Sequence, residues 1–352
     1  MRKPPSAPSR PNLEEVAARA GVSRATVSRV VNGLSTVDPE LRVRVQRAID
    51  ELGYVPNQAA RSLMTRRTDA LALLVSEPDV RVFSDPFFSG IIRGVSQEIN
   101  AAGLQLVLLM AQSLDDVPRV ERFLKAAPVD GVLLISEHAA DDSLPAWLEG
   151  SGIPFVVGGR PMQPGLSVSY VDHENFEGAW AAAQHLLSNG RSVIGTVAAP
   201  QDMSAGIDRL AGFKKGLGRA FRARRVEIGD FTQRSGEAAA TRLIERVPDL
   251  DGLFAASDLM ALGAISALRR AGRRVPEDVA VVGFDDNEFA STTEPALTTV
   301  RQDPVIQGRQ MVRLYLAQNR PDIELTTEEG LADVRGLDHL ILPVSLVVRQ
   351  SA

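Results

Sequence analysis

The stretch Val22–Gly33 combines arginine, serine and threonine side chains with valines at helical spacing. Val27, Val30 and Val31 would share one apolar face of a helix. Arginine can form two hydrogen bonds with guanine in the major groove of DNA, whereas serine and threonine hydroxyls suit phosphate oxygens. An alanine is small enough to contact a thymine methyl. The residue types predict a DNA-reading helix with the following outward side chains: Arg24, Ala25, Thr26, Ser28 and Arg29.

Capping signals on either side predict the small helical unit that would hold this helix. A three-residue turn, Ala20–Val22, would join the first two helices, as in helix-turn-helix motifs. An ordinary three-helix unit is the alternative, but it does not explain why the turn length and the exposed chemistry occur together. The expected caps are Asn12 with Glu15, Ser23 and Asp38-Pro39 at the starts, and Gly21 and Gly53 at the ends.

Charge is distributed unevenly along the chain. Residues 1–67 contain twelve Lys/Arg and six Asp/Glu, a balance of +6, which leaves 27 basic and 38 acidic residues, or −11, for the remainder. A basic head on an acidic body suggests that the head meets a polyanion, although a solvated charged surface would show the same balance.

The segment YVPNQAARSLMTRR after the third helix predicts a short helix that begins at Asn57. So short a helix is marginal by itself, so it would fold only when docked. Ala60 would allow close approach to DNA, and Leu63 could wedge between base steps in the minor groove. A plain linker is the alternative.

The run LEEVAARAGVSRATVSRVVNG, continued by LRVRVQRAIDELGYVPNQAARSL, resembles the headpiece and hinge of the lactose-repressor family of bacterial transcription regulators. The resemblance implies that Arg24, Ala25 and Arg29 read bases, and that Thr26 and Ser28 hold phosphates. It also implies that the hinge segment, with Ala60 and Leu63, occupies the minor groove.

From Asp69 onward, apolar strand-like runs alternate with amphipathic stretches such as Phe88–Ala102, Asn175–Ser188 and Asp258–Ala271. This alternation indicates parallel, doubly wound sheets covered by helices on both faces. The pattern occurs twice, with a break near Pro161–Val168, so two lobes with a ligand cleft between them are expected. The predicted strands are Ala70–Val75, Leu104–Met110, Gly131–Ile135, Pro154–Val157, Val193–Val197, Gly252–Ala256 and Val279–Gly283.

This body resembles periplasmic sugar-binding proteins and the effector domain of the same repressor family, through DGLFAASDLMALGAISAL, VPEDVAVVGFDD, LTTVRQD and LPVSLVVR. The match excludes the N-terminal tail and a segment near Thr326–Asp338. Aromatic faces with Asp, Arg and Gln suit a polyhydroxylated ring. Helix capping, a structural salt bridge or core packing could explain single members instead. The resemblance places the following residues at the cleft: Phe87, Phe88, Asp172, Arg209, Phe231, Ser257, Asp285 and Gln302. Ser257 stands where sugar-binding relatives often carry Asn, which would alter ligand preference.

The expected architecture is an N-terminal all-α helix-turn-helix head and a periplasmic-binding-protein-like α/β body of two doubly wound parallel-sheet lobes. The expected parts are a disordered tail (1–11), a DNA-binding domain (12–56), a hinge helix and linker (57–68) and an effector-binding domain (69–352). Within that last domain, the first lobe would comprise about 69–168 and 302–335, and the second about 169–300 and 337–352.

These observations predict a ligand-responsive transcriptional regulator, most simply a repressor, that binds pseudopalindromic operator DNA. The expected effector is a sugar, sugar phosphate or nucleoside. A DNA-binding protein with a vestigial cleft is the main alternative. An enzyme is disfavoured because the sequence has no GxxxxGK[ST], GxSxG or HExxH motif. A transport protein is disfavoured by the basic head and by the lack of a signal peptide.

The remaining expectations concern the oligomeric state, cofactors and cellular location. The chain stops shortly after LPVSLVVRQ, without the leucine-heptad tail of family tetramers, so a homodimer is expected. No cofactor and no metal are expected, since cysteine is absent and the four histidines are scattered. No membrane span is expected either, and the predicted location is the bacterial cytoplasm.

Overall fold

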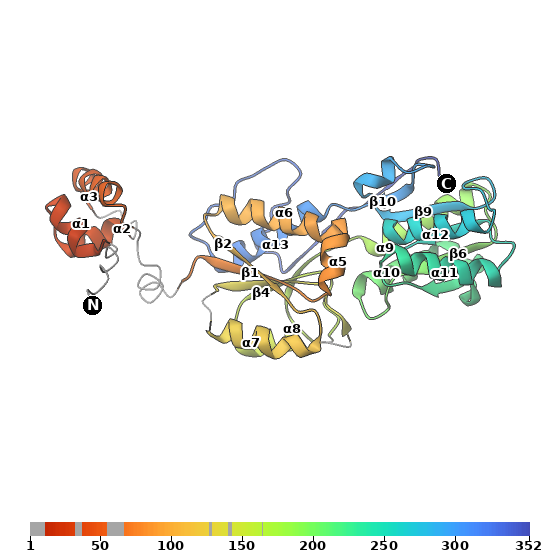
Figure 1. Ribbon diagram of the computed structural model, residues 1–352, viewed down its shortest axis with the longest axis horizontal. Helices are drawn as coiled ribbons and strands as arrows, with labels where there is room; N and C mark the ends of the chain where they lie inside the picture. The colour runs from red at the N-terminus through yellow and green to blue at the C-terminus, as the bar shows by residue number, and fades with distance from the viewer. Residues whose placement is uncertain (1–10, 32–36, 55–66, 127–128, 140–142, 164) are drawn as a thin grey trace, which may run out of the picture. The chain divides into compact units, whose positions relative to one another are not determined.

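The computed structural model describes residues 11–31, 37–54, 67–126, 129–139, 143–163 and 165–352 (Figure 1). The chain divides into two compact units, a head of residues Met1–Thr68 and a body of residues Asp69–Ala352. Within the described ranges, no helix is both long enough and apolar enough to cross a membrane.

The head contains the predicted three helices, α1 (Leu13–Ala20), α2 (Arg24–Val31) and α3 (Pro39–Leu52). Both caps expected on α1 are confirmed: Asn12 and Glu15 form the reciprocal capping box, and Gly21 ends the helix with a left-handed φ of 64°. Arg44 on α3 donates from Nη2 to the carbonyl oxygen of Ala20 at 2.6 Å. This bond ties α3 to the turn and so fixes the angle at which α2 leaves it.

The first lobe of the body is a parallel sheet with strand order β11-β5-β4-β3-β1-β2. The central strand β1 is buried along its whole length, which explains its unbroken apolar run. Helices α6 and α13 cover one face, and α7 and α8 cover the other (Figure 1). The strands are β1 (Ala70–Val75), β2 (Gln105–Met110), β3 (Gly131–Ile135), β4 (Phe155–Gly158), β5 (Ser169–His173) and β11 (His339–Leu342). The helices are α5 (Asp79–Ser84), α6 (Pro86–Ala101), α7 (Val117–Ala126), α8 (Ser143–Ser151) and α13 (Pro304–Asn319), with a 3₁₀ turn η1 (Leu114–Asp116).

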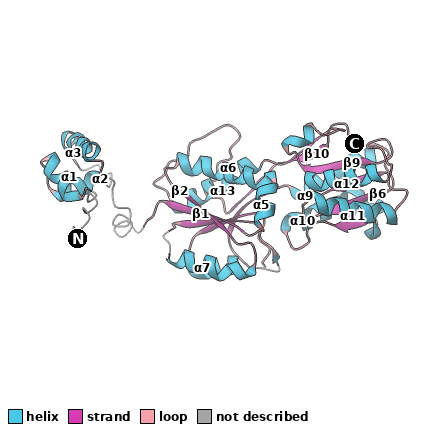
Figure 2. Ribbon diagram, viewed as in Figure 1, coloured by secondary structure: helices cyan, strands magenta, loops and turns pink. Residues whose placement is uncertain are grey.

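The second lobe repeats the plan with strand order β12-β10-β9-β8-β6-β7 (Figure 2). Its strands are parallel except for β12, which runs antiparallel to β10. The strands are β6 (Ile194–Ala198), β7 (Val226–Ile228), β8 (Gly252–Ala255), β9 (Ala280–Asp285), β10 (Thr298–Arg301) and β12 (Ser345–Val347). The helices are α9 (Asn175–Ser188), α10 (Ser204–Leu217), α11 (Gln233–Arg246) and α12 (Asp258–Arg270), with 3₁₀ turns η3 (Gly218–Ala220), η4 (Ala223–Arg225) and η5 (Glu288–Ser291).

The chain passes between the lobes at three crossovers, each directly after a strand of one sheet: after β5, after β10 and after β11. The predicted lobe boundaries are therefore wrong in two places. Residues 169–173 and 339–342 belong to the first sheet, not the second. The break expected at Pro161–Val168 is a loop between two strands of one sheet.

Helices α6 and α13 pack closely because glycines face the opposite backbone. A Cβ on Gly94 would collide with the carbonyl oxygen of Val305, and one on Gly308 would collide with that of Ile91. This close approach sets the N-terminal turns of both helices beside each other. Phe87, in the first turn of α6, and Gln307, at the start of the second turn of α13, consequently line the same cavity.

Candidate functional site

The outward face of α2 carries the side chains that the sequence predicted there. Arg24, Ala25 and Arg29 are exposed, while Val27 is buried in the head core. Arg24 lies 3.5 Å from Glu14, an exposed pair that DNA could easily displace. Thr26 is held by Ser23, whose Oγ lies 2.9 Å from the threonine hydroxyl.

Ser28 also lies on α2 and is half-buried. The other three residues predicted to contact DNA, Asn57, Ala60 and Leu63, lie outside the described residues. The DNA contact of Asn57 and the assignment of Ala60 and Leu63 to the minor groove therefore stay predictions.

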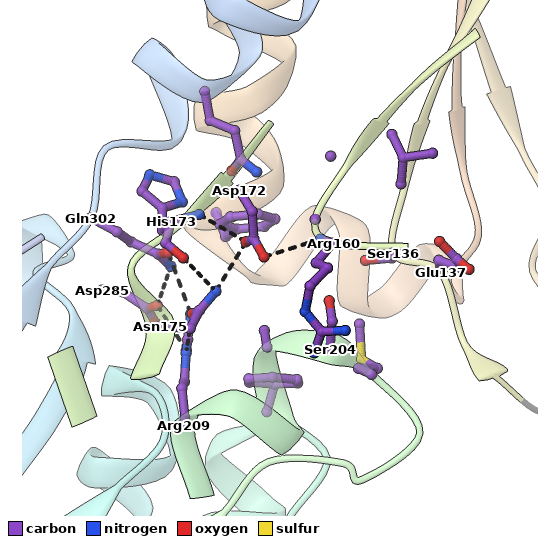
Figure 3. Close-up of a pocket in the computed structure, with 18 of the residues that line it drawn as sticks. Ser136, Glu137, Arg160, Asp172, His173, Asn175, Ser204, Arg209, Asp285 and Gln302 are labelled. Carbon is purple, nitrogen blue, oxygen red and sulfur yellow. Dashed lines mark hydrogen bonds and ion pairs between the residues drawn. The ribbon is translucent and has the colours of Figure 1, made fainter. Parts of the chain in front are cut away.

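A cavity of about 80 Å³ lies between the two lobes of the body (Figure 3). Its walls come from the ends of strands and the starts of helices in both lobes, as expected for paired α/β sheets. Six of the predicted residues line it: Phe87, Asp172, Arg209, Phe231, Asp285 and Gln302.

Arg209 is the centre of the cavity's polar network, as Figure 3 shows. The side chain is buried and donates from Nε to Asn175 Oδ1 at 2.8 Å and from Nη2 to Gln302 Oε1 at 3.3 Å. Its Nη1 donates to the carbonyl oxygen of Ala256 at 2.7 Å and lies 3.6 Å from Asp285 Oδ1. The guanidinium is thus locked in one orientation before any ligand arrives.

Asp172 connects the crossover after β5 to the loop after β4. Its Oδ1 accepts from the Asn175 side chain at 3.0 Å and from the His173 backbone at 2.8 Å, while Oδ2 accepts from the Arg160 backbone at 3.0 Å. Burial raises the pKa of this carboxyl, although the two backbone hydrogen bonds act in the opposite direction.

Burial also controls the charge of the other titratable groups. It raises the pKa of Asp285 to about 7, with Arg209 opposing that shift. Burial lowers the pKa of His173 to about 3, helped by the Arg209 charge, so this imidazole is neutral at physiological pH. Asp285 also has a φ of 123°, a strained conformation for a residue with a side chain, of the kind found at binding sites.

Buried atoms on the cavity wall that lack a hydrogen-bond partner among the described residues include Arg81 Nε, His173 Nε2 and Gln307 Oε1. Gln307 donates its amide N–H to the carbonyl oxygen of Val171 at 2.9 Å, whereas its own amide oxygen has no such partner. An unpaired buried polar atom costs free energy, so these atoms favour a ligand that supplies hydroxyl groups.

The predicted aromatic pair divides between the cavity and the core. Phe87 lines the cavity, whereas Phe88 is 1% exposed and packs in the core of the first lobe. The expectation that both face a ligand is wrong, because successive helical residues point in directions about 100° apart. Phe231 supplies the second aromatic face, with a φ of 69° that turns the chain at the end of β7.

Ser257 is not among the residues that line the cavity. It is 2% exposed and caps α12 by accepting a hydrogen bond from the backbone of Met260 at 3.2 Å. The predicted ligand contact is therefore replaced by a structural one, and the change from Asn says nothing direct about ligand preference.

The sequence interpretation missed several lining residues, which come from three loops, three helix starts, helix α5 and the end of β5: Arg81, Asp85, Glu137, Arg160, His173, Asn175, Ser204 and Gln307. Two of them gave a usable signal. Asp85 stands two residues before the predicted Phe87, and Asn175 begins a predicted helix shortly after the Asp172 strand.

Two polar links join the lobes beside the cavity. Arg160, after β4, forms a two-pronged ion pair with Asp208 on α10, with its shortest contact at 2.8 Å. His138, after β3, contacts Asp202 of the second lobe at 2.9 Å. Both links join residues of different lobes, so a movement of the lobes away from each other would break them. Among the described residues, no cluster of carboxylate, histidine or cysteine side chains is arranged to hold a metal ion.

Family models match two parts of the chain. Residues 12–57 match bacterial regulatory proteins of the lacI family, and residues 183–352 match a periplasmic binding protein-like domain. The HTH-type transcriptional regulator CelR of Thermobifida fusca is 48% identical over 346 residues, 97% of this chain and 98% of the relative. The HTH-type transcriptional repressor CytR of Escherichia coli K12 is 32% identical over 312 residues, 87% and 89% of the two chains.

Solved structures of transcriptional regulators are also similar to this chain. A complex of the transcriptional regulator CelR with cellobiose is 46% identical and superposes with a TM-score of 0.75, covering 97% of this chain and 100% of that one. The lac repressor dimer bound to operator and the anti-inducer ONPF is 27% identical, with a TM-score of 0.81 and coverages of 97% and 99%.

Proposed function

The chain belongs to the lacI family of bacterial regulatory proteins, and we propose that the effector of this DNA-binding transcriptional regulator is a neutral β-linked glucose disaccharide such as cellobiose. The observation that carries the proposal is the locked network around Arg209 in the cleft. Oriented donors and acceptors of this kind suit the many hydroxyls of a sugar ring, while Phe87 and Phe231 offer apolar faces. The similarity to a regulator solved with cellobiose supports the choice of sugar.

The charges of the lining residues argue against a phosphorylated effector. Each of the three arginines on the wall already faces a carboxylate: Arg81 pairs with Glu77, Arg160 with Asp208 and Arg209 with Asp285. Four carboxyl residues also line the cavity: Asp85, Glu137, Asp172 and Asp285. A phosphate would therefore find every arginine on the wall already paired with a carboxylate.

The proposed mechanism couples sugar binding to lobe closure. Asp172, Asn175 and Gln302 lie on the crossovers or next to them, so a sugar that bonds to them favours one angle between the lobes. A change in that angle would alter how the head and the hinge segment engage DNA. The coupling must be reciprocal, so operator DNA would change sugar affinity by the same factor.

We further propose that the protein acts as a homodimer in the bacterial cytoplasm, where its DNA lies. A dimer would place two helix-turn-helix units on the two halves of a pseudopalindromic operator. The solved lac repressor dimer on its operator supports this arrangement. Sedimentation equilibrium should give about twice the mass of the 37.9 kDa chain; a monomer at micromolar concentration would refute it.

The test is a fluorescence anisotropy titration of the full-length protein against a duplex that it has itself selected from random sequences. Adding cellobiose should change the DNA affinity at least about fivefold, the lower end of ordinary allosteric couplings. Maltose, glucose 6-phosphate and adenosine serve as controls for linkage, charge and chemical class. A response to adenosine alone would replace the sugar assignment, and no response to any compound would favour a vestigial cleft.

A further inference from the structure

A second, larger cavity of about 420 Å³ lies next to the first one. The first lobe contributes the loop after β1, helix α5 and the loop after β2 to its wall, and the second lobe contributes Pro200, Asp230 and Thr232. It is thus also a space between the lobes, and it will change shape when they move.

Arg81 on α5 lines both cavities. Its guanidinium pairs with Glu77 and lies 4.7 Å from the centre of the Phe231 ring. Its Nε is buried without a hydrogen-bond partner among the described residues. A donor at the junction therefore lacks an acceptor, which a ligand spanning both cavities could provide.

Size and chemistry distinguish the two spaces. Pockets for drug-sized ligands occupy about 300–1,000 Å³, so the second cavity of about 420 Å³ reaches that range and the first, at about 80 Å³, does not. The second wall presents an amide and hydroxyls from Gln112, Ser113 and Thr232, together with the apolar Val80 and Pro200. Its charged residues balance: Glu77 and Asp230 accompany Arg81 and His138, and hydrogen bonds to Glu77 and Asp202 raise the pKa of His138 to about 9. This combination suits a neutral, hydroxyl-bearing ligand.

We propose that the second cavity is a subsite for the further sugar units of an oligosaccharide whose terminal unit occupies the first cavity. The proposal rests on the sugar effector proposed above and adds where the rest of the ligand lies. The glycosidic oxygen or a neighbouring hydroxyl would accept the hydrogen bond from Arg81 Nε. Gln112, Ser113 and Asp230 are exposed, so the outer end is open and a chain longer than a disaccharide can extend into solvent.

Isothermal titration calorimetry of the full-length protein with glucose, cellobiose and cellotriose tests the proposal. The wild-type protein should bind cellobiose at least about tenfold more tightly than glucose, and cellotriose within about threefold of cellobiose. Two variants fill the cavity from different walls, Ser113→Trp from the loop after β2 and Ser84→Trp from α5. Each should weaken cellobiose binding about tenfold or more and change glucose binding less than about twofold. Ser113→Ala and Ser84→Ala are the matched controls that leave the space open.

The outcomes separate this proposal from the one on which it depends. If cellobiose binds and both tryptophan variants bind it like the wild type, the subsite is refuted while the sugar effector stands. If cellotriose bound more than about tenfold more weakly than cellobiose, the site would be closed at its outer end. This result would also refute the subsite. If none of the three saccharides binds, both proposals fail.

Discussion

His138 in the first lobe and Asp202 in the second form a link across the cleft, with 2.9 Å between Nδ1 and Oδ2. The other ring nitrogen, Nε2, lies 3.1 Å from Glu77 Oε1. A ring that donates to both carboxylates must carry the imidazolium charge. Hydrogen bonding to Glu77, and then to Asp202, raises the pKa of His138 to about 9, although burial acts against the shift.

The first prediction is that this link makes the body's thermal stability depend on pH. The pKa of His138 in the folded protein lies above its ordinary value of 6.5, so its stabilisation is complete below pH 6.5 and is lost as the pH rises through about 9. His138→Gln should therefore lower the Tm most at pH 6 and hardly at all at pH 10. Differential scanning calorimetry across this range measures the difference, with His185→Gln as the control. If the difference in Tm between the wild type and His138→Gln stayed constant with pH, the charged link at His138 would be contradicted.

The second prediction concerns Arg209. Arg209→Ala removes the group that orients Asn175 and Gln302, and it leaves the buried Asp285 without its cation. Cellobiose affinity should fall at least about 100-fold, since losing one partner of a buried charge pair costs about 2–5 kcal/mol. DNA affinity in the absence of sugar should stay within about threefold of the wild type.

Calorimetry and anisotropy on the same Arg209→Ala preparation give these two values. Circular dichroism shows whether the variant is folded. Arg191→Ala, in the second lobe and away from the cavity, is the matched control. A normal response to sugar in the folded variant would remove Arg209 from the site.

The third prediction separates capping from ligand binding at Ser257. Ser257→Ala deletes the acceptor for the Met260 backbone N–H, and loss of such a cap costs about 0.5–2 kcal/mol. The Tm should fall by a few degrees, whereas the cellobiose dissociation constant should change less than about twofold. A tenfold loss of affinity with an unchanged Tm would restore Ser257 to the ligand site.

The fourth prediction concerns base reading by α2. Arg24→Ala should weaken binding to the selected duplex by about 1–3 kcal/mol and relax the preference at one base-pair position. Arg47→Ala, an exposed arginine on α3, removes the same charge from the head and serves as the control. Selection experiments with each variant give the preference at every position. If both variants lose affinity equally for all sequences, Arg24 contacts only phosphate.

The head could be predicted closely from its sequence because its signals are local. Asn12 with Glu15 and the left-handed Gly21 each determine a helix end within one turn, and both are found in the structure. The six predicted residues that do line the cavity, Arg209 among them, came from motifs of known spacing in related chains.

The body was predicted less completely at the elements whose residues line the cavity, because these residues do not follow the usual apolar pattern of a strand or helix. Strand β5 (Ser169–His173) has no long apolar run, because Asp172 and His173 at its end face the cavity. Its assignment to the first sheet was missed for this reason. Gln307 was missed because it lies in the second turn of a long helix, where polar residues are ordinary. The close packing of α6 against α13 brings it to the cavity.

Because the lobes are joined at three crossovers beside the cavity, a small rotation there would give a larger displacement at the far end of the first lobe. Asp172 and Gln302 lie beside the crossovers that join the lobes, so an axis through these crossovers would pass close to them, whereas Asp69, where the body begins, lies at the far end of β1. Six strand residues separate that end from the cleft, a span of roughly 20 Å. A rotation of about 5° would therefore move Asp69 by roughly 2 Å while atoms at the axis hardly move. A sugar can thus act on the head through a displacement too small to break its own contacts.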